Sequence, residues 1–397
     1  MKKLLILTST FPKGKTDAIT ARFVWDLAES LKEFYQVFVL CPHAKGLALK
    51  EEWQGVQIYR FKYCFFADLQ LLSSGNGMAS DIRSNFLAVF QIPGFFIAQY
   101  LNAKRIIKIN HIDTVNSHWI VPQGLIGAFL KKKLGIRHVV TAHAADVFLL
   151  KRMAGAGKKL ADFIISYTDL VLPVSTYIKQ TLDSLTSQRY AYQIIPMAAN
   201  RNFSAASNDI QNKTNRGLKL LFVGKFTEKK GIIHLLEAMR ILKKEKTEVF
   251  LELVGGGILE NDLRDFVNRN DLAKNISFLG WVPNEKLPEL YRSCDILIVP
   301  SVFDRKGETE GMPVVIAEAL ACGRPVLASR ISGIPDIIQD GYNGWLVEPG
   351  SSLGIAKKIE EIGLIDLAPF QQNALKTATG LTYNKTAIKY KEAIEKV

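Results

Sequence analysis

The chain has 397 residues, a length that predicts two domains rather than one. Its composition, 48% hydrophobic and 22% charged, is ordinary for a soluble globular protein. Its four cysteines have no paired spacing, which excludes a zinc site and a disulfide framework and is typical of a reducing cytosol.

The net charge of +13 is unevenly placed along the chain. Residues 1–200 contain 24 Lys and Arg against 13 Asp and Glu, whereas residues 201–397 contain 27 against 25. The basic surface therefore belongs to the first half. Nucleic acid, an anionic membrane or a phosphorylated substrate would each explain it, and so would a surface that is basic only for solubility.

The first half alternates short apolar runs with helical patterns. Unbroken runs of Val, Ile and Leu between helices predict a parallel sheet that is covered on both faces. The opening run is too short for the core of a signal peptide, so we expect a first strand there. The expected elements are a strand at 2–8, an amphipathic helix at 20–32, and strands at 36–42, 114–118, 138–143, 170–175 and 193–200.

One apolar segment, 86–100, approaches the length of a transmembrane helix but is interrupted by Gln91, Pro93 and Gly94. Basic residues follow it and also close a later helical pattern. Aromatic residues beside basic ones suit an interfacial contact with anionic lipid, but the same run suits a core helix kinked at Pro-Gly. Both interpretations stay open. The basic residues are Lys104, Arg105, Lys108, Lys131, Lys132 and Lys133.

A polar stretch rich in Asn and Ser, residues 201–217, has no periodicity and is predicted to be a linker. The α/β pattern then restarts, which predicts two doubly wound α/β domains. Ligands of such sheets bind beyond the carboxyl ends of the strands, so we expect the site in a cleft between the domains. The expected elements are strands at 218–224, 249–255, 276–280, 295–300, 325–329 and 344–348, with a helix at 232–245.

Two turns that follow strands of the second half are candidates for binding phosphate. In LLFVGKFTEKKG, three lysines lie between a strand and a helix that begins near Gly231. Lysines are unfavourable at a helix N-terminus unless an anion binds there; a solvated basic turn is the alternative. In LVGGG, three glycines follow a strand without G-x-G-x-x-G spacing, so a tight turn is an equally good interpretation.

The stretch ETEGMPVVIAEALACG, 308–323, carries Glu318 inside an apolar run and Glu310 before it. Pro313 suits the first position of a helix and Gly323 its end, so we expect a helix over 313–321. The N–H groups of 311–315 would then point out of the helix start. An unpaired carboxylate at Glu318 would cost roughly several kcal/mol. It must therefore meet donors such as sugar or ribose hydroxyls, or form a structural ion pair.

These residues resemble the motifs of a known family. The two glutamates in EGMPVVIAEALACG are similar to the E-x7-E motif of retaining family-4 glycosyltransferases of the GT-B fold. VGKFTEKKGI resembles the family's diphosphate segment, with Lys225 where Arg is usual. Other similar segments, in the family's order, are FVWDLAESL (23–31), SHWIVPQG (117–124), TAHAADVF (141–148), VSTYIKQTL (174–182), 276–301 and GIPDIIQDGYNGWLVEPG (333–350).

The resemblance covers most of the chain and implies an α/β, GT-B architecture of two Rossmann-like domains facing a central cleft. An acceptor-side domain would span 1–200 and a nucleotide-sugar domain 218–383, with a last helix at about 384–397 joining the first domain. The implied reaction moves a sugar, with retention, from a nucleotide sugar to a hydroxyl of a glycan or lipid-linked acceptor. The context KGETEGMPVV is similar to enzymes of bacterial exopolysaccharide or O-antigen synthesis.

The resemblance also implies roles for individual residues. Lys225 and Lys230 would hold the donor diphosphate, and Glu318 would accept from the ribose hydroxyls. The donor sugar and its phosphate would lie against Glu310 and the N–H groups around Gly311, Met312, Pro313 and Val314. The backbone near Val282 would lie by the base. Glu310, Lys230 and, from the first domain, His143 are the expected catalytic residues, and His118 and Gly14 are expected on the acceptor side.

Positive charge on the leaving diphosphate would provide the catalysis, supplied by lysines and helix N-termini. We expect no cofactor beyond the nucleotide sugar, and no ligand cluster argues for a metal. Expected partners are a UDP- or GDP-sugar, a glycan or polyprenyl-linked acceptor and an anionic membrane surface, but not nucleic acid. The expected location is cytoplasmic, at the inner face of the plasma membrane.

Three departures from the family pattern concern these roles. Pro12-Lys13-Gly14-Lys15 replaces the glycine pair after the first strand, Ala144 replaces a common Gly, and PMAANRNF replaces the usual segment before the linker. Taken without the family, His143 suits a structural role as well as a functional one. The alternative functions are a sugar-nucleotide epimerase or phosphorylase of related fold, a basic nucleic-acid-binding protein, and an oxidoreductase, which would need the missing G-x-G-x-x-G.

Overall fold

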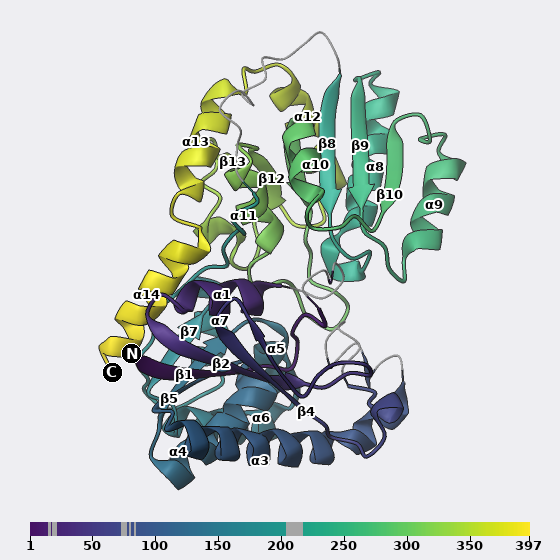
Figure 1. The fold of residues 1–397 in the computed structure, drawn as a ribbon. Helices are drawn as coiled ribbons and strands as arrows, with labels where there is room; N and C mark the ends of the chain where they lie inside the picture. Colours follow the sequence, from purple (N-terminus) through teal and green to yellow (C-terminus); the bar gives the residue numbers. More distant parts are fainter. Residues whose placement is uncertain (15–16, 18–21, 73–77, 79–80, 83–84, 204–216) are drawn as a thin grey trace. The chain divides into compact units, whose positions relative to one another are not determined.

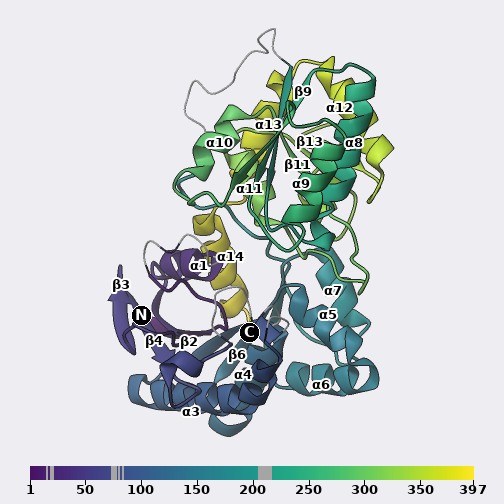
Figure 2. The same ribbon diagram turned by 90° about the vertical axis from the view of Figure 1, so that its right-hand side faces the viewer.

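The computed structural model spans residues 1–397 and describes all of them except 15–16, 18–21, 73–77, 79–80, 83–84 and 204–216. Figures 1 and 2 show two units, and each is described by itself. The first unit contains Met1–Pro196 together with Tyr383–Val397, and the second contains Met197–Thr382. Most of the linker predicted at 201–217 lies outside the described residues.

The first unit is built on a seven-stranded sheet of order β3-β4-β2-β1-β5-β6-β7. All neighbouring strands are parallel except β3 and β4. The strand order reverses between β1 and β5, which places the ends of these two strands at the topological switch point. The strands are β1 (Lys2–Leu7), β2 (Tyr35–Pro42), β3 (Lys50–Trp53), β4 (Val56–Phe61), β5 (Thr114–His118), β6 (Arg137–Ala142) and β7 (Leu170–Pro173).

Helices cover this sheet. Helix α3 runs beside α4, and α1 packs against α14, so the last helix of the chain belongs to the first unit (Figure 1). The α-helices of this unit are α1 (Phe23–Leu31), α3 (Ile92–Asn110), α4 (Leu125–Leu134), α5 (Ala145–Arg152), α6 (Ala154–Ser166), α7 (Thr176–Asp183) and α14 (Tyr383–Glu395). Shorter helical segments are η1 (Ala67–Leu69), η2 (Phe86–Gln91) and η3 (Ile120–Gly124).

The second unit has a six-stranded, all-parallel sheet of order β10-β9-β8-β11-β12-β13. Here the order reverses between β8 and β11. The strands are β8 (Leu218–Val223), β9 (Val249–Val254), β10 (Ile276–Gly280), β11 (Ile296–Val299), β12 (Val326–Ser329) and β13 (Gly344–Val347). The predicted pair of parallel, doubly wound sheets is confirmed.

Two groups of helices flank the second sheet (Figure 2). Helix α8 packs against α9 and α12, and α11 packs against α10 and α13. The helices are α8 (Ile232–Lys244), α9 (Glu260–Arg269), α10 (Leu287–Ser293), α11 (Val314–Ala321), α12 (Ser352–Gly363) and α13 (Ala368–Ala378), with short turns η4 (Glu228–Lys230) and η5 (Ile334–Asp336).

The strand predicted at 193–200 is wrong. The chain there runs beside β7, and the N–H groups of Gln193 and Ile195 donate to the carbonyls of Val171 (3.1 Å) and Pro173 (3.0 Å). Pro196 has no N–H to continue this ladder, so only isolated bridges form.

The Pro93-Gly94 pair, which interrupts the apolar segment, lies at the start of α3 rather than inside a helix. Segment η2 leads directly into α3, because Pro93 lies in the first turn of α3, where its missing N–H costs no hydrogen bond. By length and composition alone, Phe86–Asn110 could cross a membrane. Helix α3 nevertheless buries one face, including Phe95 and Gln99, against the first sheet and exposes Ile97 and Leu101.

Candidate functional site

The predicted donor-side residues gather where strands of the second unit end. After β8, the chain forms a short turn, η4, and then enters α8 through Gly231. Gly231 has a φ of +64°, and a Cβ there would lie 1.9 Å from the carbonyl oxygen of Pro300, which follows β11. A glycine is therefore required for the β8 and β11 loops to approach each other. This approach brings Lys230 to the carboxyl ends of the two strands at the switch point.

The glycine run after β9 is explained by close packing. A Cβ on Gly255 would lie 2.0 Å from the carbonyl oxygen of Gly224, and one on Gly257 would lie 2.7 Å from that of Phe226. Of the two interpretations of LVGGG, the structure thus favours the tight turn. The same packing holds the β8 turn, including Lys225, in place.

Lys230 and Glu310 form an ion pair, with Nζ 2.6 Å from Oε2. Both side chains are mostly buried, with 15% and 13% of their surface exposed. Burial on its own would raise the pKa of Glu310, but the charges of Lys230 and Lys229 and the hydrogen bond from Lys230 lower it. Glu310 is therefore a carboxylate at neutral pH, and Lys230 is held beside the place where we expect a donor phosphate.

The loop that carries Glu310 is tied to the segment after β12. The hydroxyl of Ser332 donates to the carbonyls of Glu310 and Gly311, and the N–H of Gly333 donates to Gly311 at 3.2 Å. Pro313 is extended, with ψ of 118°, and is the N-cap of α11 rather than its first residue, which corrects the predicted start. Gly311, Met312 and Pro313 are buried immediately before the helix, and Val314 is half-buried at its first position.

Glu318 is held by a tyrosine. The Tyr291 hydroxyl, fully buried on α10, donates to Oε2 of Glu318 at 2.7 Å. Burial and the neighbouring carboxylate raise the pKa of Tyr291 well above its ordinary value, so this hydroxyl stays a donor. One partner of Glu318 is thus a neutral hydroxyl donor. Val282 lies after β10, beside Trp281, whose side chain is 55% exposed.

In the first unit the predicted histidines meet. His118 ends β5 and His143 follows β6, and Nδ1 of the first lies 3.2 Å from Nε2 of the second. The rings of Phe23 and Trp119 each lie 5.1 Å from the His143 ring. Burial lowers the pKa of both histidines, and for His118 the neighbouring His143 lowers it further. Nε2 of His118 is buried without a hydrogen-bond partner among the described residues.

Asp146, on α5, is a member of this cluster that the sequence predictions missed. Its Oδ2 accepts from the N–H of Ile120 at 2.7 Å and from that of His143 at 3.4 Å, so it fixes both loops. Burial raises its pKa to about 6, although several backbone N–H groups act in the opposite direction. Its place three residues after His143, in the motif that marked the histidine, is the signal that could have found it.

Gly14 lies in the loop after β1, where its carbonyl accepts from the N–H of Asp17 at 3.1 Å. It borders a small cavity with Arg22 and Trp25, and neither His118 nor His143 is among the described residues that line this cavity. In the described part of the chain, no group of three or more His, Cys, Asp or Glu side chains is placed to hold a metal ion.

Comparisons with known proteins decide the family. Residues 20–198 match the model of Glycosyltransferase Family 4, and residues 204–374 match that of Glycosyl transferases group 1. An uncharacterized glycosyltransferase of Methanocaldococcus jannaschii is 33% identical over 276 residues, which are 70% of this chain and 72% of the relative. The chain belongs to the family-4 glycosyltransferases.

Two further proteins are similar to this glycosyltransferase. The amylovoran biosynthesis glycosyltransferase AmsK of Erwinia amylovora is 29% identical over 226 residues, 57% of this chain and 54% of AmsK. The solved structure of Anabaena HepE in complex with UDP has a TM-score of 0.73 at 16% identity and covers 100% of both chains. The predicted GT-B fold class is thereby confirmed.

Proposed function

We propose that this glycosyltransferase moves a sugar, with retention, from a nucleotide sugar to a hydroxyl of a glycan or polyprenyl-linked acceptor during cell-surface polysaccharide synthesis. The observation that carries the proposal is the buried ion pair of Lys230 and Glu310 in the loops that follow β8 and β11, with Glu318 held by Tyr291 on the helix that comes after Glu310. A parallel α/β sheet binds its ligands at the strand ends that such loops follow.

The donor site follows from the chemistry of these groups. A diphosphate would lie against Lys230 and Lys225, because each phosphate needs a compact positive charge. Glu318, with one oxygen fixed by Tyr291, would accept from the ribose hydroxyls. Glu310 and the backbone of 311–314 would hold the sugar and its phosphate, and the segment at Val282 would lie by the base. That HepE was solved with UDP supports a UDP-sugar, and a GDP-sugar is the alternative.

The reaction exchanges one bond at the anomeric carbon. The bond from that carbon to the diphosphate oxygen breaks, and a bond to the acceptor oxygen forms on the same face. The acceptor proton passes to the departing phosphate. Lys230 would stabilise the growing negative charge on the diphosphate, a role that requires no resident cofactor or metal.

Glu310 prepares Lys230 for this role. In the 2.6 Å pair the ammonium is held in place by the carboxylate. A diphosphate would give Lys230 a second anionic partner without moving it, so little reorganisation is needed when charge develops. His143 would contact the donor sugar and His118 the acceptor side, each as a neutral ring because burial lowers its pKa.

AmsK, named for amylovoran biosynthesis, supports a role in polysaccharide synthesis, with lipopolysaccharide or exopolysaccharide as the product class. A polyprenyl-linked acceptor would lie at a membrane. We therefore place the enzyme in the cytoplasm, on the inner face of the plasma membrane, where the basic first half of the chain would meet anionic lipid.

The test is product analysis with UDP- and GDP-sugars and a polyprenyl-linked acceptor, followed by NMR of the new linkage. The proposal predicts a glycoside with the anomeric configuration of the donor, undiminished by a chelator, and loss of product in Lys230→Ala. An inverted linkage would contradict retention. Conversion of the donor without any transfer would point to the epimerase instead.

A further inference from the structure

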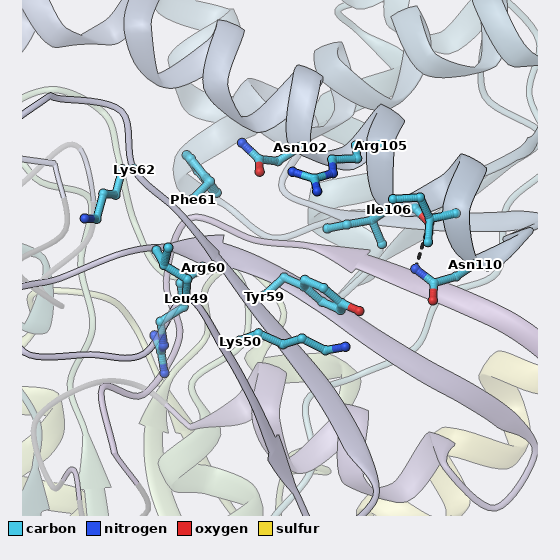
Figure 3. Close-up of a pocket in the computed structure, with 11 residues that line it drawn as sticks. Leu49, Lys50, Tyr59, Arg60, Phe61, Lys62, Asn102, Arg105, Ile106 and Asn110 are labelled. Atoms are coloured by element: carbon cyan, nitrogen blue, oxygen red, sulfur yellow. Dashed lines mark hydrogen bonds between the residues drawn. The ribbon is translucent and has the colours of Figure 1, made fainter.

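A groove in the first unit lies away from the residues assigned above. It opens between the carboxyl half of α3 and the edge formed by β3 and β4, and it encloses about 550 Å³. Figure 3 shows Asn102, Arg105, Ile106 and Asn110 of α3 facing Tyr59 and Lys50 of the strands. Ile106 is buried and Tyr59 half-buried at this place, so the groove has an apolar base and a polar rim.

The charge of the groove is positive. Among the described residues, four basic ones line it and no acidic one does. Arg60 is already paired, since its guanidinium lies 3.0 Å from Glu51 and donates to the carbonyl of Pro12. Lys50, Lys62 and Arg105 are exposed and have no acidic partner among the described residues.

One acidic residue lies near this groove on the same face of β3. Glu52, two positions from Lys50, accepts a hydrogen bond from Gln57 at 3.3 Å and does not line the groove. The ammonium of Lys50 lies over the Tyr59 ring, 5.1 Å from its centre, which fixes its position. Three cations around a half-enclosed space with hydroxyl and amide groups suit a phosphate.

Exposed apolar side chains border the groove, where Leu49 and Ile109 line it, and recur along α3 and the segments that precede it in sequence. Ten of the 27 exposed large hydrophobic side chains in the described part of the chain fall between residues 65 and 109. Leu101 and Ile109 are 55% and 64% exposed on α3. The other exposed apolar residues of this stretch are Phe65, Phe66, Leu69, Phe86, Leu87, Val89, Phe90 and Ile97. Exposed apolar side chains beside cations suit the membrane interface, where charged lipid headgroups meet acyl chains.

We infer that the groove binds the phosphate of an anionic phospholipid while the apolar surface of η2 and α3 enters the adjacent lipid layer. This inference deepens the proposed function and rests on its membrane placement, because it names the site and the headgroup. A soluble phosphate would fill the groove but leave the apolar surface in water. The combination of both features is what selects a lipid.

The test is flotation of the full chain with vesicles of phosphatidylcholine alone or with about a third phosphatidylglycerol. The chain should float with the anionic vesicles and do so less at high salt. Lys50→Ala with Arg105→Ala should weaken this partition roughly 30-fold, because each cation near an anionic surface strengthens membrane binding by roughly a factor of five. Leu101→Ser with Ile109→Ser should weaken it at any salt concentration.

The matched control is Lys244→Ala with Lys274→Ala, which removes two exposed lysines from the second unit. It should float like the wild type; an equal loss in the control would reduce the effect to net charge and overturn the inference. Calorimetry with inorganic phosphate separates a soluble ligand, since tight binding of phosphate without flotation would also overturn it. Stronger binding of the chain to duplex DNA than to the anionic vesicles would also overturn the inference.

UDP- and GDP-sugar binding in the groove variants distinguishes this inference from the proposed function. Neither Lys50 nor Arg105 belongs to the donor site, so donor affinity should stay at the wild-type value. Failure of flotation with intact donor binding refutes only the lipid site. Failure of donor binding in the wild type refutes the proposed function, whatever the vesicles show.

Discussion

Replacing Lys230 with Met leaves the Glu310 carboxylate without the cation that now lies 2.6 Å away. Removing one partner of a buried ion pair costs about 3–5 kcal/mol. Because 13% of the Glu310 side chain is exposed, we expect the lower end, about 3 kcal/mol. For a unit of this size, that corresponds to a fall in Tm of roughly 6–12 °C.

The destabilisation should depend on pH. The Glu310 carboxylate stabilises the fold in the wild type and destabilises it in the variant. In the wild type the pKa of Glu310 is lowered, so the carboxylate stabilises the fold above its unfolded pKa and loses this contribution as pH falls. In Lys230→Met, burial is the largest remaining influence and raises the pKa. The destabilisation is then present at neutral pH and shrinks as pH falls and the carboxyl becomes protonated.

Thermal unfolding at about pH 7.5 and about pH 5 measures this difference, and hydrogen exchange of peptides from α8 and α11 assigns it to the second unit. Lys229→Met is the control, because Lys229 acts on Glu310 only through its charge and should show a much smaller loss. Equal losses in the two variants, or a deficit in Lys230→Met that does not shrink at the lower pH, would refute the reasoning.

Three further predictions concern single features. Tyr291→Phe removes the hydrogen bond to Glu318, worth roughly 1.5–3 kcal/mol, and should lower donor affinity about tenfold. In a Glu318→Gln background, calorimetry should find that Tyr291→Phe causes a smaller loss of affinity. Fully additive losses in the double variant would contradict the role of Tyr291 in positioning Glu318. Gly231→Ala should lower the Tm of the second unit far more than Gly307→Ala, because both glycines have positive φ but only Gly231 would place a Cβ against backbone, 1.9 Å from Pro300; similar melting curves would sink this explanation. The first unit should lose stability as pH falls below about 6.5, because burial lowers the pKa of His118 and of His138, the latter to about 4, so that the unfolded chain binds protons first. Asp146, with its pKa raised to about 6, opposes this trend by taking up a proton in the folded state. Hydrogen exchange of β5 and β6 at several pH values checks the sign, and protection that is flat or rises toward acid would contradict it.

The central strands could be predicted because both of their faces are buried. Strands β1, β5, β8 and β11 are almost continuous apolar runs or lie inside the sheet, and their predicted ranges agree with the structure to within two residues. The edge strand β3 and its neighbour β4 were missed for the opposite reason. Glu51, Glu52 and Gln57 interrupt their apolar pattern, as strands at or next to the edge of a sheet, with partly exposed side chains, permit.

The contacts among the candidate site residues could not be predicted from the sequence. Lys230 and Glu310 are separated by 80 positions, and nothing local in either segment indicates that they pair. Tyr291 reads as an ordinary apolar member of a short helix until the fold brings it to Glu318. The sequence around Gly231 indicates only the start of a helix. The need for a glycine there comes from the loop after β11, whose Pro300 carbonyl leaves no room for a Cβ.

The most direct test of the donor site is calorimetric titration of the wild type and Glu318→Ala with UDP- and GDP-sugars, with circular dichroism to show that the variant is folded. The account predicts that one nucleotide series binds the wild type and that Glu318→Ala binds it at least several-fold more weakly. Binding of equal strength in the folded variant, or no binding of either series to the wild type in the presence of lipid acceptor, would contradict it.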